Sequence, residues 1–168
     1  MAAHRDVLYR LAFAWCHDAA LSDDLVQETL LRALAHRAQL RDPERLKSWL
    51  CSILANALRD HYRRLRPNDD IDALAEELAD PAPTPEEARA QAELVARVRK
   101  AIARLPLGQR QVLTLVDLEG LSYAEVGEAL AVPLGTVMSR LCRAREALRT
   151  PLLAYAPGTG AVPLRRVK

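Results

Sequence analysis

The sequence is poor in aromatic residues and in glycine, and both shortages argue against a sheet-rich fold. Its 168 residues include two Trp, four Tyr, one Phe and six Gly. Ala, Leu and Arg dominate instead, and these residues are typical of helices. Half of the chain is hydrophobic, which is enough to bury a core. We therefore predict an all-α protein, built as two small helical domains.

Cysteine is also scarce, and its spacing does not suit a metal site. Cys16, Cys51 and Cys142 lie far apart, with no CxxC motif and no Cys/His pair at metal-ligand spacing. We interpret them as reduced and mostly buried, and keep a redox or metal role as the weaker alternative. We expect neither a metal nor a cofactor.

Long apolar runs are missing as well. No run approaches the roughly 20 residues that a membrane span needs. Asp6 and Arg10 interrupt the N-terminus, which makes it a poor signal peptide. We therefore expect a soluble, cytoplasmic protein that does not insert into a membrane.

The net charge of +2 conceals a segregation of charge along the chain. Residues 1–65 carry ten basic and eight acidic side chains, residues 66–90 two basic and eight acidic, and residues 91–168 twelve basic and six acidic. A basic C-terminal half favours a nucleic-acid partner, whereas ordinary solvated surface charge would not explain the segregation.

The N-terminal domain, residues 1–65, is predicted to be a three-helix bundle. The first helix spans about 4–17, and Ser22 is the expected N-cap of a second helix that continues to about Ala38. Asp42-Pro43 then opens a third helix with a continuous apolar stripe that reaches Leu65.

A proline-containing acidic segment, residues 66–83, is predicted to be a flexible linker; it is either a plain spacer or a segment that threads along a partner. A capping box at Thr84 opens the second domain, residues 84–153, and the basic tail, residues 154–168, is expected to be disordered.

The end of the second domain has the pattern of a helix-turn-helix. A capping box at Ser122 opens a short helix, and Pro133 opens a longer basic helix that would lie in the DNA major groove. Four apolar residues of that helix should pack inward: Val137, Leu141, Ala144 and Leu148. The polar residues on its other side could bond bases or phosphates, although an amphipathic helix could also show this pattern merely by being solvated.

The residues of this half closely resemble region 4 of the extracytoplasmic-function (ECF) sigma factors of bacterial RNA polymerase. The similar segments are Leu105-Pro106, Gln109 to Leu113, Glu119 to Val126, Pro133 to Leu141 and Arg143 to Arg145. Region 2 of the same family is resembled by Asp24 to Thr29, and by Trp49-Leu50 with the helix that follows. Met138 departs from the family pattern, because relatives often have a basic residue there.

The resemblance implies a protein that binds core RNA polymerase and promoter DNA, with an anti-sigma factor as a probable further partner. For the minus-35 element it implies Thr136, Met138, Ser139, Arg140, Arg143, Arg145 and Arg149. For the minus-10 element it implies Ser52, Asn56, Arg59, Arg63 and Arg64, with a loop at about 39–47 that captures a flipped base. For core polymerase it implies Asp24, Leu25, Gln27, Glu28 and Leu31.

Two other functions compete with this one. A stand-alone helix-turn-helix regulator would share the second domain, but it would leave the Asp24 to Thr29 segment unexplained. A DNA-processing enzyme such as a recombinase would need a nucleophile beside a base or a metal cluster, and the sequence offers neither. We therefore expect a sigma factor and no enzyme activity.

Overall fold

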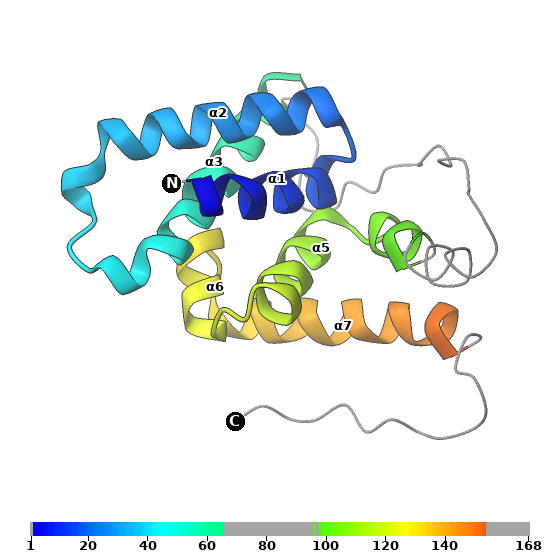
Figure 1. Ribbon diagram of the computed structural model, residues 1–168. Helices are drawn as coiled ribbons and strands as arrows, with labels where there is room; N and C mark the ends of the chain where they lie inside the picture. Colours follow the sequence, from blue (N-terminus) through cyan, green and yellow to red (C-terminus); the bar gives the residue numbers. More distant parts are fainter. Residues whose placement is uncertain (1, 66–95, 97, 154–168) are drawn as a thin grey trace.

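The computed structural model describes residues 2–65, 96 and 98–153, and this part of the chain is helical, with no strand (Figure 1). The N-terminal half contains α1 (Ala2–Cys16), α2 (Ala19–Ala35), the short 3-10 turns η1 (Arg37–Gln39) and η2 (Pro43–Arg45), and α3 (Leu46–Leu65). The C-terminal half contains a helical turn at 98–103, α5 (Leu107–Leu113), the π-helical turn η4 (Thr114–Leu118), α6 (Tyr123–Leu130) and α7 (Leu134–Leu153). The all-α prediction is confirmed. The predicted linker, the capping box at Thr84 and the tail after 153 lie outside the described residues.

Two of the predicted helix starts are confirmed. The Asp42 side chain accepts a hydrogen bond from the Glu44 backbone N–H at 2.9 Å and so caps η2, which leads directly into α3. Ser122 and Glu125 form the predicted reciprocal capping box of α6. In both places a local side chain bonds N–H groups that the first helical turn leaves free, which is why the sequence alone locates them.

The predicted start of the second helix was wrong. Asp18, not Ser22, caps α2, because its side chain accepts a hydrogen bond from the Leu21 N–H at 3.0 Å. His17 adopts a left-handed backbone (φ 54°), which turns the chain early enough for α2 to begin at Ala19. Ser22 is therefore inside the helix and buried, and its hydroxyl donates to the Asp18 carbonyl. The helix also ends at Ala35, before the predicted Ala38.

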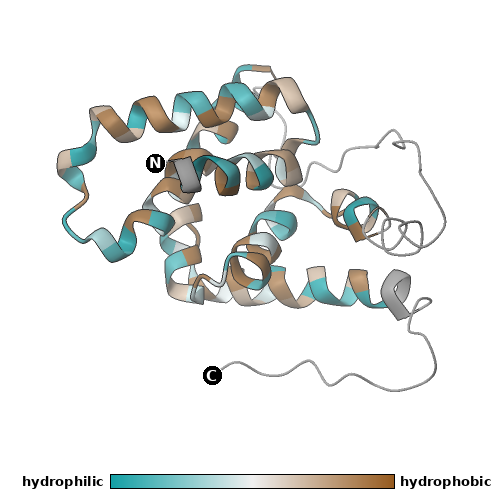
Figure 2. Cartoon of the chain, viewed as in Figure 1, coloured by the Kyte–Doolittle hydropathy of each residue, from teal (hydrophilic) through white to brown (hydrophobic). Residues whose placement is uncertain are grey.

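The two halves share one hydrophobic core. Each helix has hydrophobic and hydrophilic stretches along its ribbon (Figure 2), and the buried side chains of both halves form one continuous cluster. Trp15 of α1 is fully buried at the junction, and its indole Nε1 donates to the Thr114 hydroxyl at 2.8 Å. The sequence suggested reading surfaces on two separately mobile domains; in this structure they are packed together.

Arg110 is the charged group at this junction. Its guanidinium is buried and donates to three carbonyl oxygens, those of Trp15 (2.6 Å), Ala103 (2.7 Å) and Leu105 (2.9 Å). Bonds from the two terminal nitrogens to carbonyl oxygens offset the cost of burying such a cation. The Arg110 side chain thus fixes α5 against the end of α1.

Replacing Arg110 by Met should lower the free energy of unfolding by about 3 kcal/mol, because buried carbonyls lose a charged donor. Urea denaturation followed by circular dichroism measures the change. Arg143→Met, at an exposed position of α7, is the matched control and should change stability by about 0.5 kcal/mol or less. Equal stability of the two variants would contradict this role of Arg110.

His17 should make stability fall in mild acid. Burial, and secondarily the positive charge of Arg110, lower the pKa of His17 from 6.5 to about 4. Below pH 6.5 the unfolded chain therefore binds a proton that the folded chain does not, and stability is lost as the pH falls from about 6.5 to about 4. Urea denaturation at pH 7.5 and pH 5 should show this loss, and His17→Asn, which tolerates the left-handed backbone, should reduce it. An unchanged pH dependence in the variant would exclude His17 as the cause.

Candidate nucleic-acid interface

The last helix, α7, separates a buried face from an exposed one. Val137, Leu141, Ala144 and Leu148 are buried, as predicted. Ser139 and Arg143 are exposed on the opposite face, with Met138 exposed at its edge and Thr136 half-buried. Because α7 lies at the edge of the molecule (Figure 1), this outer face is available to a large partner.

Two arginines of the predicted reading set are held by the protein itself. The Arg140 guanidinium lies against Gly108 of α5, so closely that a Cβ at Gly108 would be 2.7 Å from its Nη1. Arg145 donates to both carboxylate oxygens of Asp117, with Nη2 to Oδ1 at 2.5 Å and Nε to Oδ2 at 3.1 Å. Arg143, by contrast, is exposed.

The more distal Arg149 has a looser contact. Its Nε lies 3.7 Å from the Glu146 carboxylate, and both side chains are exposed. An ion pair of this kind contributes little and can exchange for a phosphate. Among the described residues, Arg143 and Arg149 are therefore the two arginines of α7 that remain available to DNA.

The polar stripe of α3 also exists, but part of it faces the C-terminal half. Arg59 donates to Asn56 Oδ1 at 3.0 Å and to the carbonyl of Leu130, at the end of α6, at 2.9 Å. Arg63 and Arg64 are exposed near the end of the helix, whereas the Ser52 hydroxyl donates to the Trp49 carbonyl at 2.7 Å. In the middle of the stripe Arg59 is therefore bonded to the C-terminal half, whereas Arg63 and Arg64 at its end are exposed.

Two further contacts join the start of α3 to the C-terminal half, and the sequence did not reveal them. Lys47 Nζ lies 2.8 Å from the Glu119 carboxylate and donates to the Glu119 carbonyl at 2.6 Å. Arg45 Nη1 lies 3.4 Å from the Glu128 carboxylate of α6. More than 70 residues separate Lys47 from Glu119 in the chain, so no local pattern could have paired them.

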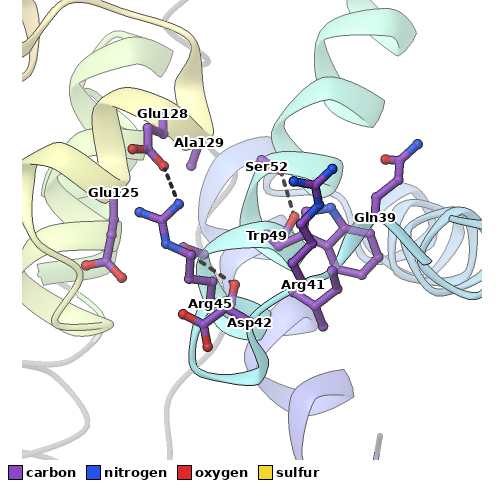
Figure 3. A pocket seen from close by; sticks show the side chains of 11 residues that line it. Gln39, Arg41, Asp42, Arg45, Trp49, Ser52, Glu125, Glu128 and Ala129 are labelled. Atoms are coloured by element: carbon purple, nitrogen blue, oxygen red, sulfur yellow. Dashed lines mark hydrogen bonds and ion pairs between the residues drawn. The ribbon is translucent and has the colours of Figure 1, made fainter. Parts of the chain in front are cut away.

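The Arg45–Glu128 pair borders a cavity of about 480 Å³ between the predicted base-capturing loop and α6 (Figure 3). It is lined by Gln39, Leu40, Arg41, Asp42, Arg45, Ser48, Trp49, Ser52, Glu125, Glu128 and Ala129. The loop side offers arginines and an aromatic ring, which suit a nucleotide. The α6 side offers two carboxylates, which repel phosphate.

The outer face of α2 is the third candidate surface. Asp24, Gln27 and Leu31 are exposed, and Leu31 retains 67% of its accessible surface. Leu25, by contrast, is 2% exposed and packs in the core. Glu28 pairs with Arg32 at 2.6 Å, and Arg32 reaches Asp60 of α3 at 3.2 Å. The accessible part of the predicted docking segment is therefore Asp24, Gln27 and Leu31.

Comparison with known proteins identifies both halves. Residues 1–67 match the family model Sigma-70 region 2, and residues 96–148 match Sigma-70, region 4. The ECF RNA polymerase sigma factor SigC of Mycobacterium tuberculosis is 38% identical over 137 residues, which cover 80% of this chain and 72% of SigC. The chain belongs to the ECF RNA polymerase sigma factors. Members of this family are transcription initiation factors and not enzymes.

Other ECF sigma factors extend the comparison. SigE of Mycolicibacterium smegmatis is 37% identical over 93% of this chain, but the match spans only 61% of SigE. The sigma factor RpoE of Bartonella quintana, solved in complex with the anti-sigma factor NepR, superposes with a TM-score of 0.72 at 27% identity, covering 90% of this chain and 93% of RpoE. CnrH, solved with the cytosolic domain of CnrY, gives a TM-score of 0.61 at 28% identity, covering 92% of this chain and 86% of CnrH. Within the described residues, no helix is long and apolar enough to cross a membrane.

Proposed function

We propose that this ECF sigma factor binds core RNA polymerase in the cytoplasm and directs it to promoters, reading the minus-35 element with α7 and the minus-10 element with α3. The observation that carries the proposal is the presence of both sigma regions in one chain, each with an exposed polar helix face. Strand opening then needs binding energy from captured bases, and no catalytic residue.

The packed arrangement of the two halves is part of the proposal. Arg45, Lys47 and Arg59 of the N-terminal half all contact groups of the C-terminal half, and the carboxylates of Glu128 and Glu119 pair with Arg45 and Lys47, two cations that could otherwise bind a DNA phosphate. The free protein is therefore a poor reader of minus-10 DNA. Core polymerase separates the halves and provides the spacing between the two promoter elements.

An anti-sigma factor is the proposed regulator. RpoE, solved with the anti-sigma factor NepR, and CnrH, solved with the cytosolic domain of CnrY, both resemble this structure over 90% or more of the chain. Such a partner would act by favouring the packed arrangement, since a ligand shifts an equilibrium toward the state that it binds more tightly.

The function is tested by run-off transcription from a genomic library with purified core polymerase, with and without this protein. Specific start sites should appear only when both are present, and the free protein should bind the same promoters weakly. Tight, specific footprints from the free protein would instead support a stand-alone regulator.

The packed arrangement is tested by removing its carboxylates. The double variant Glu119→Ala/Glu128→Ala should bind the minus-10 non-target strand, as a labelled oligonucleotide, about two- to thirtyfold more tightly than the parent, because the exposed Arg45–Glu128 pair and the less exposed Lys47–Glu119 pair together contribute on the order of 0.5 to 2 kcal/mol to the packed arrangement. Asp6→Ala/Asp24→Ala removes the same charge from exposed positions outside the contact, and so corrects for net charge. An equal gain in this control would mean that charge alone, and not opening, raises the affinity.

The proposed docking of α2 on core polymerase is tested by substitutions on the exposed face of this helix. Asp24→Lys and Leu31→Asp should each weaken holoenzyme formation about tenfold or more, the scale of an interface hot spot. Glu28 is left intact, because its reversal would also disturb the pair with Arg32. Asp6→Lys, on the exposed side of α1, is the control for charge reversal. Unchanged pull-down of core polymerase by correctly folded variants would remove this surface from the proposal.

A further inference from the structure

The outer face of α7 is less basic than its sequence suggests, and this changes which side chains can read bases. Arg140 rests on Gly108, and Arg145 is paired with Asp117. In this class of motif the N-terminal half of the second helix enters the major groove first. In that half of α7, Met138 and Ser139 are exposed.

Met138 is a large apolar side chain in that position. It retains 53% of its accessible surface, and Leu134, one helical turn earlier, retains 52%. Neither is needed for the core, because the buried face of α7 is formed by other residues, beginning with Val137. Because Met138 lies beside the exposed Ser139 at the edge of the polar face, DNA bound to this face would cover it.

The chemistry of the major groove indicates which DNA group Met138 could contact. A thioether donates no hydrogen bond and accepts only weakly, so Met138 cannot read the polar edges of the bases. The apolar group that the major groove presents is the C5-methyl group of thymine. The unbranched methionine side chain adapts its shape readily and suits such a contact.

We propose that Met138 is a specificity-determining residue that contacts the C5-methyl group of a thymine in the minus-35 element. The proposal rests on the proposed function, because it requires α7 to lie in the major groove. It also fixes a register: Met138 precedes Arg143 by five residues, or about 7.5 Å along the helix. The thymine therefore lies about two base pairs from the base or phosphate that Arg143 contacts.

The test uses holoenzyme assembled from the full chain and core polymerase. Selection on randomised minus-35 sequences first gives the preferred motif, and each thymine of either strand is then replaced singly by deoxyuridine, which lacks only the methyl group. At one position the replacement should weaken binding by the parent holoenzyme about fourfold, the value for burying one methyl-sized group. The same replacement should have no effect on Met138→Ala holoenzyme.

Two matched variants make the result specific. Met138→Leu keeps an apolar side chain and should retain much of the discrimination between thymine and uracil. Leu134→Ala removes the neighbouring exposed apolar side chain and should leave the discrimination unchanged. A discrimination that persists in Met138→Ala, or that is absent from the parent, overturns the proposal while the sigma function stands. Failure of the parent holoenzyme to select any motif would instead overturn the proposed function itself.

Discussion

The burial of the Arg110 guanidinium is the constraint on which the arrangement of this sigma factor depends. The cation must find acceptors inside the protein, and it finds them at the ends of two helical segments, at Ala103 and Leu105 in its own half and at Trp15 in the other. Trp15 in turn donates to Thr114, one helical turn after Arg110. These bonds set the orientation of α5 against α1. The packing of α7 on α5 and of α6 on α7 then places α6 against α3 of the N-terminal half.

The polar contacts between the halves also bear on the separation that the proposed function requires. Only one of the three Arg110 bonds, that to Trp15, crosses between the halves, so separation leaves two of its acceptors in place. The Arg45–Glu128 pair is about 60% exposed on both sides and contributes little. The Lys47–Glu119 pair is stronger, because the Glu119 side chain is only 9% exposed. The polar contacts fix the geometry of the interface and the shared hydrophobic core adds to its stability, so under the proposed function the binding of polymerase must offset both.

The sequence predicted features that follow from regular local patterns, and it missed an irregular local backbone as well as contacts between distant residues. The caps at Asp42 and Ser122 and the buried stripe of α7 follow from side chains within a few positions of one another. The start of α2 was missed because it depends on the left-handed backbone conformation of His17, which the sequence pattern does not predict.

The reading surfaces were predicted with the same limits. The sequence assigned Arg59 and Arg145 to DNA by residue type and helix face, but their present partners come from remote parts of the chain. Asp117 is 28 residues from Arg145, and Leu130 is 71 residues from Arg59. Periodicity identifies which side chains lie on a polar face, and only tertiary packing decides which of them are free.

The accessibility of the three surfaces suggests an order of events. Asp24, Gln27 and Leu31 of α2 are exposed while the halves are packed, and so is Arg143 of α7. The middle of the α3 stripe is engaged in the same state. Under the proposed function, core polymerase would dock on α2 before the halves separate, whereas minus-10 reading would wait until they have done so. Such an order would couple base capture to assembly and confine promoter melting to the holoenzyme, because Arg59 would leave the Leu130 carbonyl only after polymerase has bound.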